Sequence, residues 1–332
     1  MRVATALVTG GLGCIGAWTA RHLLMEGDRV VVLDPSDNSG RLRRLVPPEL
    51  LDRVALVSGD ISDLATVEGV LADHRVERIV HLAALQIPFC RADPHLGAQV
   101  NVVGTVSVFE AARRAGISHV VYTSSVAVFD QDGGPLGAGA VPNPTSFYGV
   151  YKLANEGTAS AYWNDFEFPS IGVRPMTVYG PGRDRGLTSS PTKAIVAAVL
   201  GARYEIAFGG TTFLHYAGDV GGALATAART PVEGAPVVNL NGVTASVADI
   251  VESLRRRAGD SADGITLRPD PIPFPDDVDT TGLDILGPPP VTPLDDGIAA
   301  TLAFFHDLKA SGQLVPEEHG LTVTGDLATD LA

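Results

Sequence analysis

Short apolar runs alternate with stretches of helical pattern through the first half of the chain. The apolar runs are rich in Val, Ile and Leu and are followed by turn residues, which is typical of buried strands. Strands that alternate with helices predict an α/β fold, with a parallel sheet covered on both faces. The predicted strands span 3–8, 30–33, 53–57, 78–82, 119–123 and 169–174, and the predicted helices span 17–26, 63–74, 88–115 and 148–163.

A glycine-rich turn joins the first predicted strand to the first predicted helix. It reads Thr9-Gly10-Gly11-Leu12-Gly13-Cys14-Ile15-Gly16, in the strand–turn–helix setting that a dinucleotide-binding fingerprint requires. Glycine allows a tight turn, a close approach of the backbone to a pyrophosphate, and close packing of helix on strand. The N–H groups at the helix start, around Cys14 and Ile15, would receive the phosphates. The alternative is a glycine turn that binds nothing.

Polar or small residues follow the ends of the other predicted strands, where open α/β sheets bind ligands. Asp34 ends the second strand, 18 positions after Gly16. Its carboxylate can accept hydrogen bonds from a ribose diol and would repel a 2′-phosphate, which favours NAD over NADP. The arginines at 41, 43 and 44 could reach a 2′-phosphate or form a solvated helix face. We expect further cofactor contacts from Asp60, Ile61, Leu82, Ala83, Ala84, Thr123 and Pro175, although Asp60 could serve only its turn.

Two polar residues have roles within predicted helices. Asn101 lies within an apolar face of the stretch 88–115, and a buried amide must find hydrogen-bond partners. Backbone groups of neighbouring strands could supply them, which would make Asn101 structural. Ser62 precedes the helix 63–74 and is predicted to be its N-cap.

Composition narrows the class of protein. The chain has 332 residues, of which 45% are hydrophobic and 19% charged, so we expect a large folded core. The net charge of −14 argues against a nucleic-acid partner, because phosphates would be repelled.

No apolar run approaches the roughly 18–20 residues that cross a bilayer. The early first strand leaves no room for a signal peptide, so we expect a cytoplasmic protein without a membrane partner. Cys14 and Cys90 form no CxxC and the eight histidines form no HExxH, so no metal site is predicted.

The helix 148–163 opens on Tyr148 and Lys152, which share one face because they are four positions apart. A tyrosine has a pKa near about 10, and the lysine ammonium together with an oxidised nicotinamide would stabilise its phenolate. Lowering this pKa to about 7 requires on the order of 4 kcal/mol. The phenolate would take the proton of a substrate hydroxyl while hydride leaves the same carbon. Ser125, at the end of the fifth strand, could hold that hydroxyl, whereas Tyr151 is predicted to pack.

These motifs, in this order, resemble the extended short-chain dehydrogenase/reductase family in its epimerase/dehydratase branch. The resemblance covers nearly the whole chain and rests on TGGLGCIG, Asp34, GDI, HLAA, NVVGT, YTSSVAVF and YGVYK. It implies a Rossmann-type doubly wound parallel sheet with a smaller C-terminal substrate lobe. It also implies NAD as cofactor, and a homodimer formed through the helices 88–115 and 148–163.

The resemblance also implies roles for individual residues. Tyr148 would be the acid/base, Ser125 the third catalytic residue, and Lys152 the partner of Tyr148 and a ligand of the nicotinamide ribose. Asn101 would support the site from behind. The cofactor contacts would be Gly10, Gly13, Ile15 and Gly16 at the pyrophosphate, Asp34 at the adenosine ribose, and Asp60 and Ile61 at the adenine.

The second half of the chain has a looser pattern. We expect an NAD-binding domain at 1–170, a substrate lobe at 171–312 that is interleaved with the end of the sheet, and an acidic tail at 313–332. A surface loop is predicted at 130–143 and a lid-like loop at 271–290. Further helices are predicted at 191–200, 220–229, 246–257 with a cap formed by Ser246 and Asp249, and 293–308.

Two departures from the family pattern concern the substrate. Nucleotide-sugar epimerases of the family usually carry Asn where this chain has Thr177 and Arg where it has Thr212, and those residues serve the nucleotide diphosphate. A diphosphate needs cations and amides, so their replacement argues against a nucleotide-linked sugar. Arg183 could clamp a carboxylate or phosphate, or pair with Asp184 within its loop. The predicted substrate contacts are Gln86, Ser125, Val126, Tyr148, Thr177 and Arg183.

Three functions follow from these residues. The first is an NAD-dependent oxidoreductase acting on a secondary alcohol or ketone of a small polyhydroxylated substrate, such as a free sugar or a sugar acid. The second is an epimerase or dehydratase that keeps its NAD bound and returns the hydride. The third is a non-catalytic dinucleotide sensor. The presence of Tyr148 and Lys152 argues against this third function. A serine hydrolase is disfavoured, because no G-x-S-x-G occurs.

Overall fold

The computed structural model describes residues 3–129, 136, 140–271, 275–287 and 289–321. A seven-stranded sheet has the order β10-β6-β5-β4-β1-β2-β3, and every neighbouring pair is parallel. The connections run in opposite directions on either side of β1 and β4, which opens a crevice for ligands at the carboxyl ends of these strands. The predicted doubly wound sheet is confirmed. Its strands are β1 (Thr5–Thr9), β2 (Arg29–Asp34), β3 (Val54–Ser58), β4 (Arg78–His81), β5 (Val120–Thr123), β6 (Ser170–Arg174) and β10 (Val237–Asn239).

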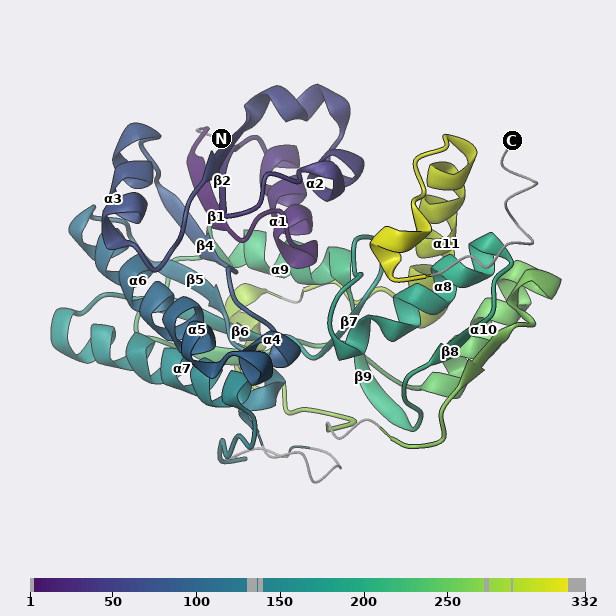
Figure 1. The fold of residues 1–332 in the computed structure, drawn as a ribbon. Coiled ribbons are helices and arrows are strands. Elements are labelled where there is room, and N and C mark those ends of the chain that lie inside the picture. Colours follow the sequence, from purple (N-terminus) through teal and green to yellow (C-terminus); the bar gives the residue numbers. More distant parts are fainter. Residues whose placement is uncertain (1–2, 130–135, 137–139, 272–274, 288, 322–332) are drawn as a thin grey trace.

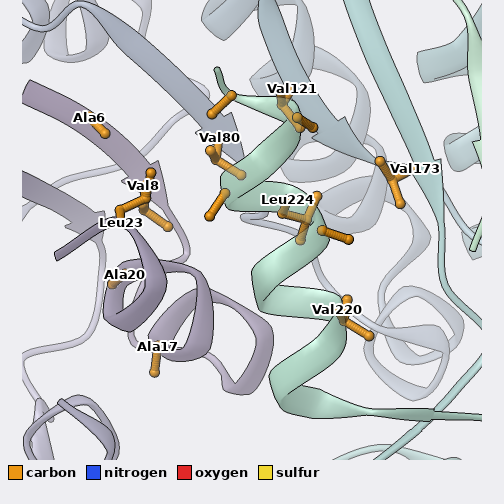
Figure 2. Packing of buried hydrophobic residues seen from close by; sticks show 14 of the residues in the cluster. Ala6, Val8, Ala17, Ala20, Leu23, Val80, Val121, Val173, Val220 and Leu224 are labelled. Carbon is orange, nitrogen blue, oxygen red and sulfur yellow. The ribbon is translucent and has the colours of Figure 1, made fainter. Parts of the chain in front are cut away.

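Helices cover both faces of this sheet (Figure 1). One face packs on α1 (Cys14–Met25) and α9 (Ala217–Ala227), and the other packs on α3 (Leu64–Asp73), α6 (Gly104–Arg114) and α7 (Phe147–Phe166). Successive residues of β1 show the division, because Val8 belongs to the first core and Leu7 to the second. Figure 2 shows the first core, in which Val8, Val80, Val121 and Val173 of the sheet face Val220 and Leu224 of α9.

A smaller lobe follows the sixth strand. It contains a three-stranded sheet of β11 (Val243–Ser246), β9 (Thr211–Tyr216) and β7 (Thr177–Tyr179), and a parallel pair of β12 (Ile265–Leu267) and β8 (Tyr204–Ile206). Its core is formed with α8 (Ser190–Leu200), α10 (Val247–Ala258) and α11 (Leu294–Ala310). The predicted cap of α10 is present, because Ser246 and Asp249 exchange hydrogen bonds in a capping box. Since β10 and α9 return to the main sheet, the two lobes are interleaved.

The predicted long helix 88–115 is wrong as a continuous element. It is divided into α4 (Ile87–Ala92), α5 (Pro94–Ala98), a π-helical turn Gln99–Val103, and α6. Asp93 has extended backbone, with φ −139°, and its carboxylate accepts a hydrogen bond of 2.9 Å from Leu96 N. Pro94 disfavours helical backbone at the residue before it, so the break falls there.

The predicted N-cap of the helix after β3 is also corrected. Asp63, and not Ser62, caps α3, because the Asp63 carboxylate accepts a hydrogen bond from Ala65 N at 3.2 Å. The Ser62 N–H instead bonds the Asp60 carboxylate at 2.8 Å, so Asp60 does close its turn. Between β2 and β3 lie α2 (Gly40–Leu45) and the 3₁₀ helix Pro48–Arg53.

The predicted acidic tail is corrected over its first part. The 3₁₀ helix Pro316–His319 folds back onto the molecule, with His319 and Leu321 buried and Glu318 paired with Arg44 of α2 at 2.7 Å. Residues 322–332 lie outside the described residues, as do 130–135 and 137–139 of the predicted surface loop.

The loop 271–290 is not a lid over the site in its described part. Its Val278 bridges to Leu136, its Asp279 carbonyl accepts a hydrogen bond from Asn239 of β10 at 2.7 Å, and its 3₁₀ helix Leu283–Leu286 belongs to the core around α9. Among the described residues, no helix combines the length and apolarity that a membrane span requires, and no three His, Cys, Asp or Glu side chains cluster as metal ligands.

Candidate active site

The glycine turn between β1 and α1 forms an open cradle. Gly10 has φ +68°, and a Cβ there would lie 2.8 Å from Ala83 N of the segment after β4. A Cβ at Gly16 would collide with the Gly10 carbonyl, so α1 lies directly against the turn. Gly13 is the N-cap of α1 and no side chain caps this end, which leaves its first N–H groups for a phosphate.

A groove runs from this cradle along the carboxyl ends of the strands. It is continuous with a smaller pocket, since residues such as Ile15, Thr123 and Arg183 line both. Tyr148, Lys152 and Pro175 line the smaller pocket, which meets the groove where a nicotinamide would lie. The predicted cofactor residues that line the groove itself are Gly10, Gly13, Cys14, Ile15, Gly16, Asp34, Asp60, Ile61, Leu82, Ala83, Ala84 and Thr123.

Asn101 lies outside this lining and holds the segment that follows β4. Its amide oxygen accepts a hydrogen bond from Leu85 N at 2.7 Å, and its amide nitrogen donates to Leu85 O at 2.9 Å. A third partner is Cys90 Sγ of α4, 3.5 Å from the amide nitrogen, so none of the three partners belongs to a strand. The supporting role of Asn101 stays a prediction.

A buried hydrogen-bond chain between β1, β4 and α6 escaped the sequence analysis. Thr105 donates to Asn101 O at 2.7 Å, so its oxygen accepts from His81 Nε2 at 3.0 Å, and Nδ1 of His81 accepts from Thr9 at 2.7 Å. The Thr9 oxygen in turn accepts from Leu82 N and Ala83 N, each at 3.2 Å. Burial lowers the pKa of His81 to about 3, so the ring is neutral. A neutral ring is what this series of hydrogen bonds requires, because Nδ1 must accept. These hydrogen bonds fix the backbone of Leu82 and Ala83, which line the groove.

The three predicted catalytic residues converge on the pocket. Ser125 caps the 3₁₀ helix Val126–Val128 and accepts from Ala127 N at 3.1 Å, while its side chain hydrogen-bonds Tyr148. The Lys152 ammonium donates to Thr123 O at 2.7 Å and lies 5.7 Å from the centre of the Tyr148 ring. The sequence analysis did not single out Gly149, where a Cβ would meet Ala127 O and would lie 2.8 Å from Pro144 Cβ. Its lack of a side chain lets α7 bring Tyr148 to Ser125.

Burial governs the titration of the catalytic pair. It raises the pKa of Tyr148 to about 12, against the lowering effects of the Ser125 hydrogen bond and the Arg183 charge. It lowers the pKa of Lys152 to about 8. The residues of the chain alone therefore do not bring the pKa of Tyr148 near neutrality, and the predicted phenolate still requires the charge of the oxidised nicotinamide that the sequence analysis paired with Lys152.

The pocket beyond Tyr148 contains two buried polar groups without partners in the described part of the chain. They are Nε of Arg183 and the amide oxygen of Gln86. Arg183 donates from Nη2 to Thr188 at 2.9 Å, and Asp184 pairs with Arg41 instead of with its loop neighbours. Val126 also lines this pocket, as do Met176 and Thr188, which the sequence analysis did not name.

Thr177 does not line the pocket. It is fully buried on β7, and its hydroxyl lies 2.9 Å from the hydroxyl of Thr212 on β9. The two positions that departed from the family pattern therefore form a neutral pair that satisfies itself.

Comparison with known proteins gives the family. The sequence pattern of the NAD dependent epimerase/dehydratase family matches residues 6–241. The chain belongs to this family. UDP-glucose 4-epimerase of Mycolicibacterium smegmatis is 34% identical over 91% of this chain and 98% of its own length. D-erythronate dehydrogenase of Cupriavidus necator is 31% identical over 78% of this chain and 84% of its own length.

Solved structures agree on the fold of this epimerase/dehydratase-family enzyme. The UDP-glucose 4-epimerase of Thermus thermophilus in complex with NAD is similar with a TM-score of 0.76 and 25% identity, covering 91% of this chain and 98% of that one. The L-threonine dehydrogenase of Clostridium difficile has a TM-score of 0.79 at 19% identity, covering 92% and 99%. NAD is the cofactor of this family, and the cradle around Gly10 fits its pyrophosphate.

Proposed function

We propose that this enzyme transfers hydride between NAD and a secondary alcohol or ketone of a small polyhydroxylated substrate, a free sugar or a sugar acid. The observation that carries the proposal is the buried Thr177–Thr212 pair, 2.9 Å apart, at the positions where nucleotide-sugar epimerases hold a diphosphate. Neutral hydroxyls that bond each other supply no charge to a diphosphate. The relative that acts on D-erythronate, by its name, uses such a small acid.

The unpartnered groups of the pocket support an acidic substrate. Arg183 has a buried, unpartnered Nε beside the unpartnered amide oxygen of Gln86. A carboxylate would accept from the guanidinium and a neighbouring hydroxyl would donate to the amide, which satisfies both buried groups. Both residues line the same pocket as Tyr148 and Ser125, so the hydroxyl-bearing carbon would lie between these two pairs.

The proposed chemistry is a paired loss of proton and hydride. NAD, when bound, accepts the hydride of the alcohol carbon or returns it. Ser125 orients the substrate hydroxyl and Tyr148 takes its proton. Lys152, fixed by Thr123 O at 2.7 Å, supports the negative charge that forms on the phenol. Because burial raises the pKa of Tyr148 to about 12, we infer that the phenol loses its proton only with the positive nicotinamide over the pocket.

The roles of the groove residues belong to the same proposal. Asp34 holds the adenosine ribose, and Asp60 and Ile61 border the adenine. Asn101 positions the groove wall through Leu85, as its two hydrogen bonds to that residue support. The glycine turn holds the pyrophosphate through Gly10, Gly13, Cys14, Ile15 and Gly16, and the nicotinamide half lies against Leu82, Ala83, Ala84, Thr123, Lys152 and Pro175.

A substrate panel tests the proposal. Purified enzyme with excess NAD is given four-, five- and six-carbon sugar acids and the matching free sugars, and NADH is followed by absorbance. We expect steady NADH formation with at least one sugar acid. Absence of NADH with every compound, together with conversion of a UDP-sugar to its 4-epimer, would establish the epimerase alternative instead. That alternative is supported by the match to the mycobacterial UDP-glucose 4-epimerase over 98% of its length.

A homodimer is the second part of the proposal. Apolar side chains are exposed on α4 to α6 and on α7, the elements through which the resemblance implies dimerisation. Phe147, Val150 and Phe166 of α7 are each about half exposed, at 51%, 46% and 53%. Exposed apolar surface concentrated on adjacent helices marks an interface. Their neighbours on α4 to α6 are Phe89, Leu96, Val103 and Val106.

A further inference from the structure

Two arginines of α2 are held by carboxylates that come from distant parts of the chain. Arg41 forms an ion pair with Asp184, which lies in the loop after β7. Arg44 pairs with Glu318 of the C-terminal 3₁₀ helix at 2.7 Å. Both arginines are mostly buried, with 21% and 22% of their side chains exposed, and all four residues line the cofactor groove. Both ion pairs therefore border the groove; Asp184 is mostly buried, whereas 40% of the Glu318 side chain is exposed.

These pairs lie beside the carboxylate that would hold the adenosine ribose. Leu12 connects them, because its N–H donates to Asp34 at 3.2 Å while its carbonyl accepts from the Arg41 guanidinium. Arg44 lies about one helical turn further along α2 and also lines the groove. A phosphate on the ribose 2′-oxygen would therefore enter the reach of both guanidinium groups.

We propose that Asp184 and Glu318 are specificity-determining residues, which keep Arg41 and Arg44 engaged and so favour NAD over NADP. Arginine is the residue that recognises a ribose 2′-phosphate in folds of this type. Here each arginine has its guanidinium bound to a carboxylate, and with Asp34 the carboxylates outnumber the two cations. A phosphate would have to displace a carboxylate and would then be repelled by it.

Arg43, His319 and Arg185 do not replace these arginines, and Arg183, which also lines the groove, is assigned above to the substrate pocket. Arg43 points to Ser39, with a hydrogen bond of 3.1 Å, and does not line the groove. Burial lowers the pKa of His319, whose ring packs edge-on against Phe305, so it carries no charge at neutral pH. Arg185 lines the groove but is exposed, where solvent weakens its attraction for a phosphate.

Dinucleotide binding to the full chain measures the effect without any substrate. The double variant Asp184→Asn/Glu318→Gln is compared with wild type, and dissociation constants for NADH and NADPH are obtained from energy transfer between tryptophan and the reduced nicotinamide. We expect the ratio of NADPH to NADH affinity to rise at least tenfold. The control is Glu317→Gln on the same 3₁₀ helix, an exposed position that does not line the groove and should leave the ratio unchanged.

Arginine variants separate this proposal from a general effect of charge. In the double variant, the released guanidinium groups of Arg41 and Arg44 would bind the phosphate. Adding Arg41→Met and Arg44→Met removes these groups and should return the ratio to its wild-type value. The proposal is overturned if the double variant has a native circular dichroism spectrum and an unchanged ratio, or if the gain persists without the arginines. Should the double variant not fold, Glu318→Gln alone decides, with an expected rise of about threefold and no rise as the contradicting result.

Discussion

At the scale of single residues, burial outweighs charge throughout the site. It raises the pKa of Tyr148 to about 12 and lowers the pKa of Lys152 to about 8, although the two side chains are neighbours. Each group resists becoming charged in the dry pocket. The proton transfer that we propose therefore depends on a charged cofactor, and the chain alone is a poor base.

Replacement of Tyr148 tests the acid/base role. Tyr148→Phe removes the only atom that takes the substrate proton in our proposal, so kcat should fall by about 10²–10⁴-fold. NADH formation under saturating substrate measures it. Tyr151→Phe is the control, because its hydroxyl bonds Pro94 O at 2.8 Å, away from the pocket. Equal activity of both variants would contradict the assignment.

Arg183 should set the preference for an acid. Arg183→Met removes the guanidinium that faces the pocket, so KM for a sugar acid should rise by at least tenfold, while KM for the matching neutral sugar changes little. Initial rates with both compounds measure this split. Arg29→Met, at an exposed position at the amino end of β2 that lines neither the pocket nor the groove, should change neither value. A similar rise for acid and neutral sugar would show that Arg183 only shapes the loop.

His81 should make the fold sensitive to acid. Its pKa in the folded chain, about 3, lies below the ordinary 6.5, so the unfolded chain binds the proton first as pH falls. The contribution of His81 to the free energy of unfolding is complete above pH 6.5 and is lost progressively down to about pH 3. At pH 5 the loss is about 2 kcal/mol. Denaturant unfolding at pH 7 and pH 5 measures this loss. We expect His81→Gln to be less sensitive to pH than wild type, and His306→Gln, at an exposed histidine, to match wild type.

Local spacing indicated the residues that converge on the pocket, namely Ser125, Tyr148 and Lys152, whereas contacts between distant elements could not be predicted. The glycine turn and the Tyr148–Lys152 pair are encoded within a few consecutive positions. Thr177 is predicted at the substrate from its position in the family pattern, and nothing local indicates that its hydroxyl bonds that of Thr212, 35 positions away. His81 and Thr105 lie within motifs that were noticed, but their hydrogen-bond chain joins separate elements.

At the scale of elements, close approach explains how α7 delivers its tyrosine. Gly149 and Gly157 lie on the same helix, yet a Cβ at Gly149 would meet Ala127 O and Pro144, whereas a Cβ at Gly157 would meet nothing within 4 Å. The sequence predicted this helix but not which glycine is needed for packing. The same limit applied to the stretch 88–115, where helical pattern concealed the break at Asp93 and the π-helical turn.

An alanine pair on α7 checks this difference. Gly149→Ala should reduce the free energy of unfolding by about 1–3 kcal/mol through overpacking, and should displace Tyr148. Gly157→Ala should increase it by about 0.5–1 kcal/mol, because alanine is the better helix former in open space. Equilibrium denaturation of both variants gives the two values. An equal increase in the free energy of unfolding of both variants would mean that α7 is not closely packed against the segment around Ala127.

At the scale of the whole molecule, α5, α6 and α7 lie on the flank of the sheet away from the smaller lobe (Figure 1), and these helices carry exposed apolar side chains. The flank was predicted as the dimer surface from the resemblance alone. The C-terminal segment was missed at this scale. Residues 313–321 have no helical period, and the burial of His319 and Leu321 depends on elements that are distant in the sequence.

A charge on this flank should separate the proposed dimer. Wild type is expected to elute as a dimer in size-exclusion chromatography with light scattering, and Val150→Asp as a monomer, because a buried carboxylate without a partner is costly. Met25→Asp, at an apolar position on α1 that is 58% exposed, is the control and should remain dimeric. A monomeric wild type at micromolar concentration would contradict the proposed assembly.

The late return of α9 and β10 to the main sheet has a consequence for synthesis on the ribosome. Residues 1–170 leave one face of the central strands without its α9 cover. They also leave β5 without a neighbour on its outer side, because β6 only begins at Ser170 and β10 ends at Asn239. A nascent chain of that length exposes Val80 and Val121 to solvent and to chaperones. Truncation at residue 170 is therefore expected to give an aggregating fragment, and the nucleotide-binding half becomes stable only after the smaller lobe has begun to emerge.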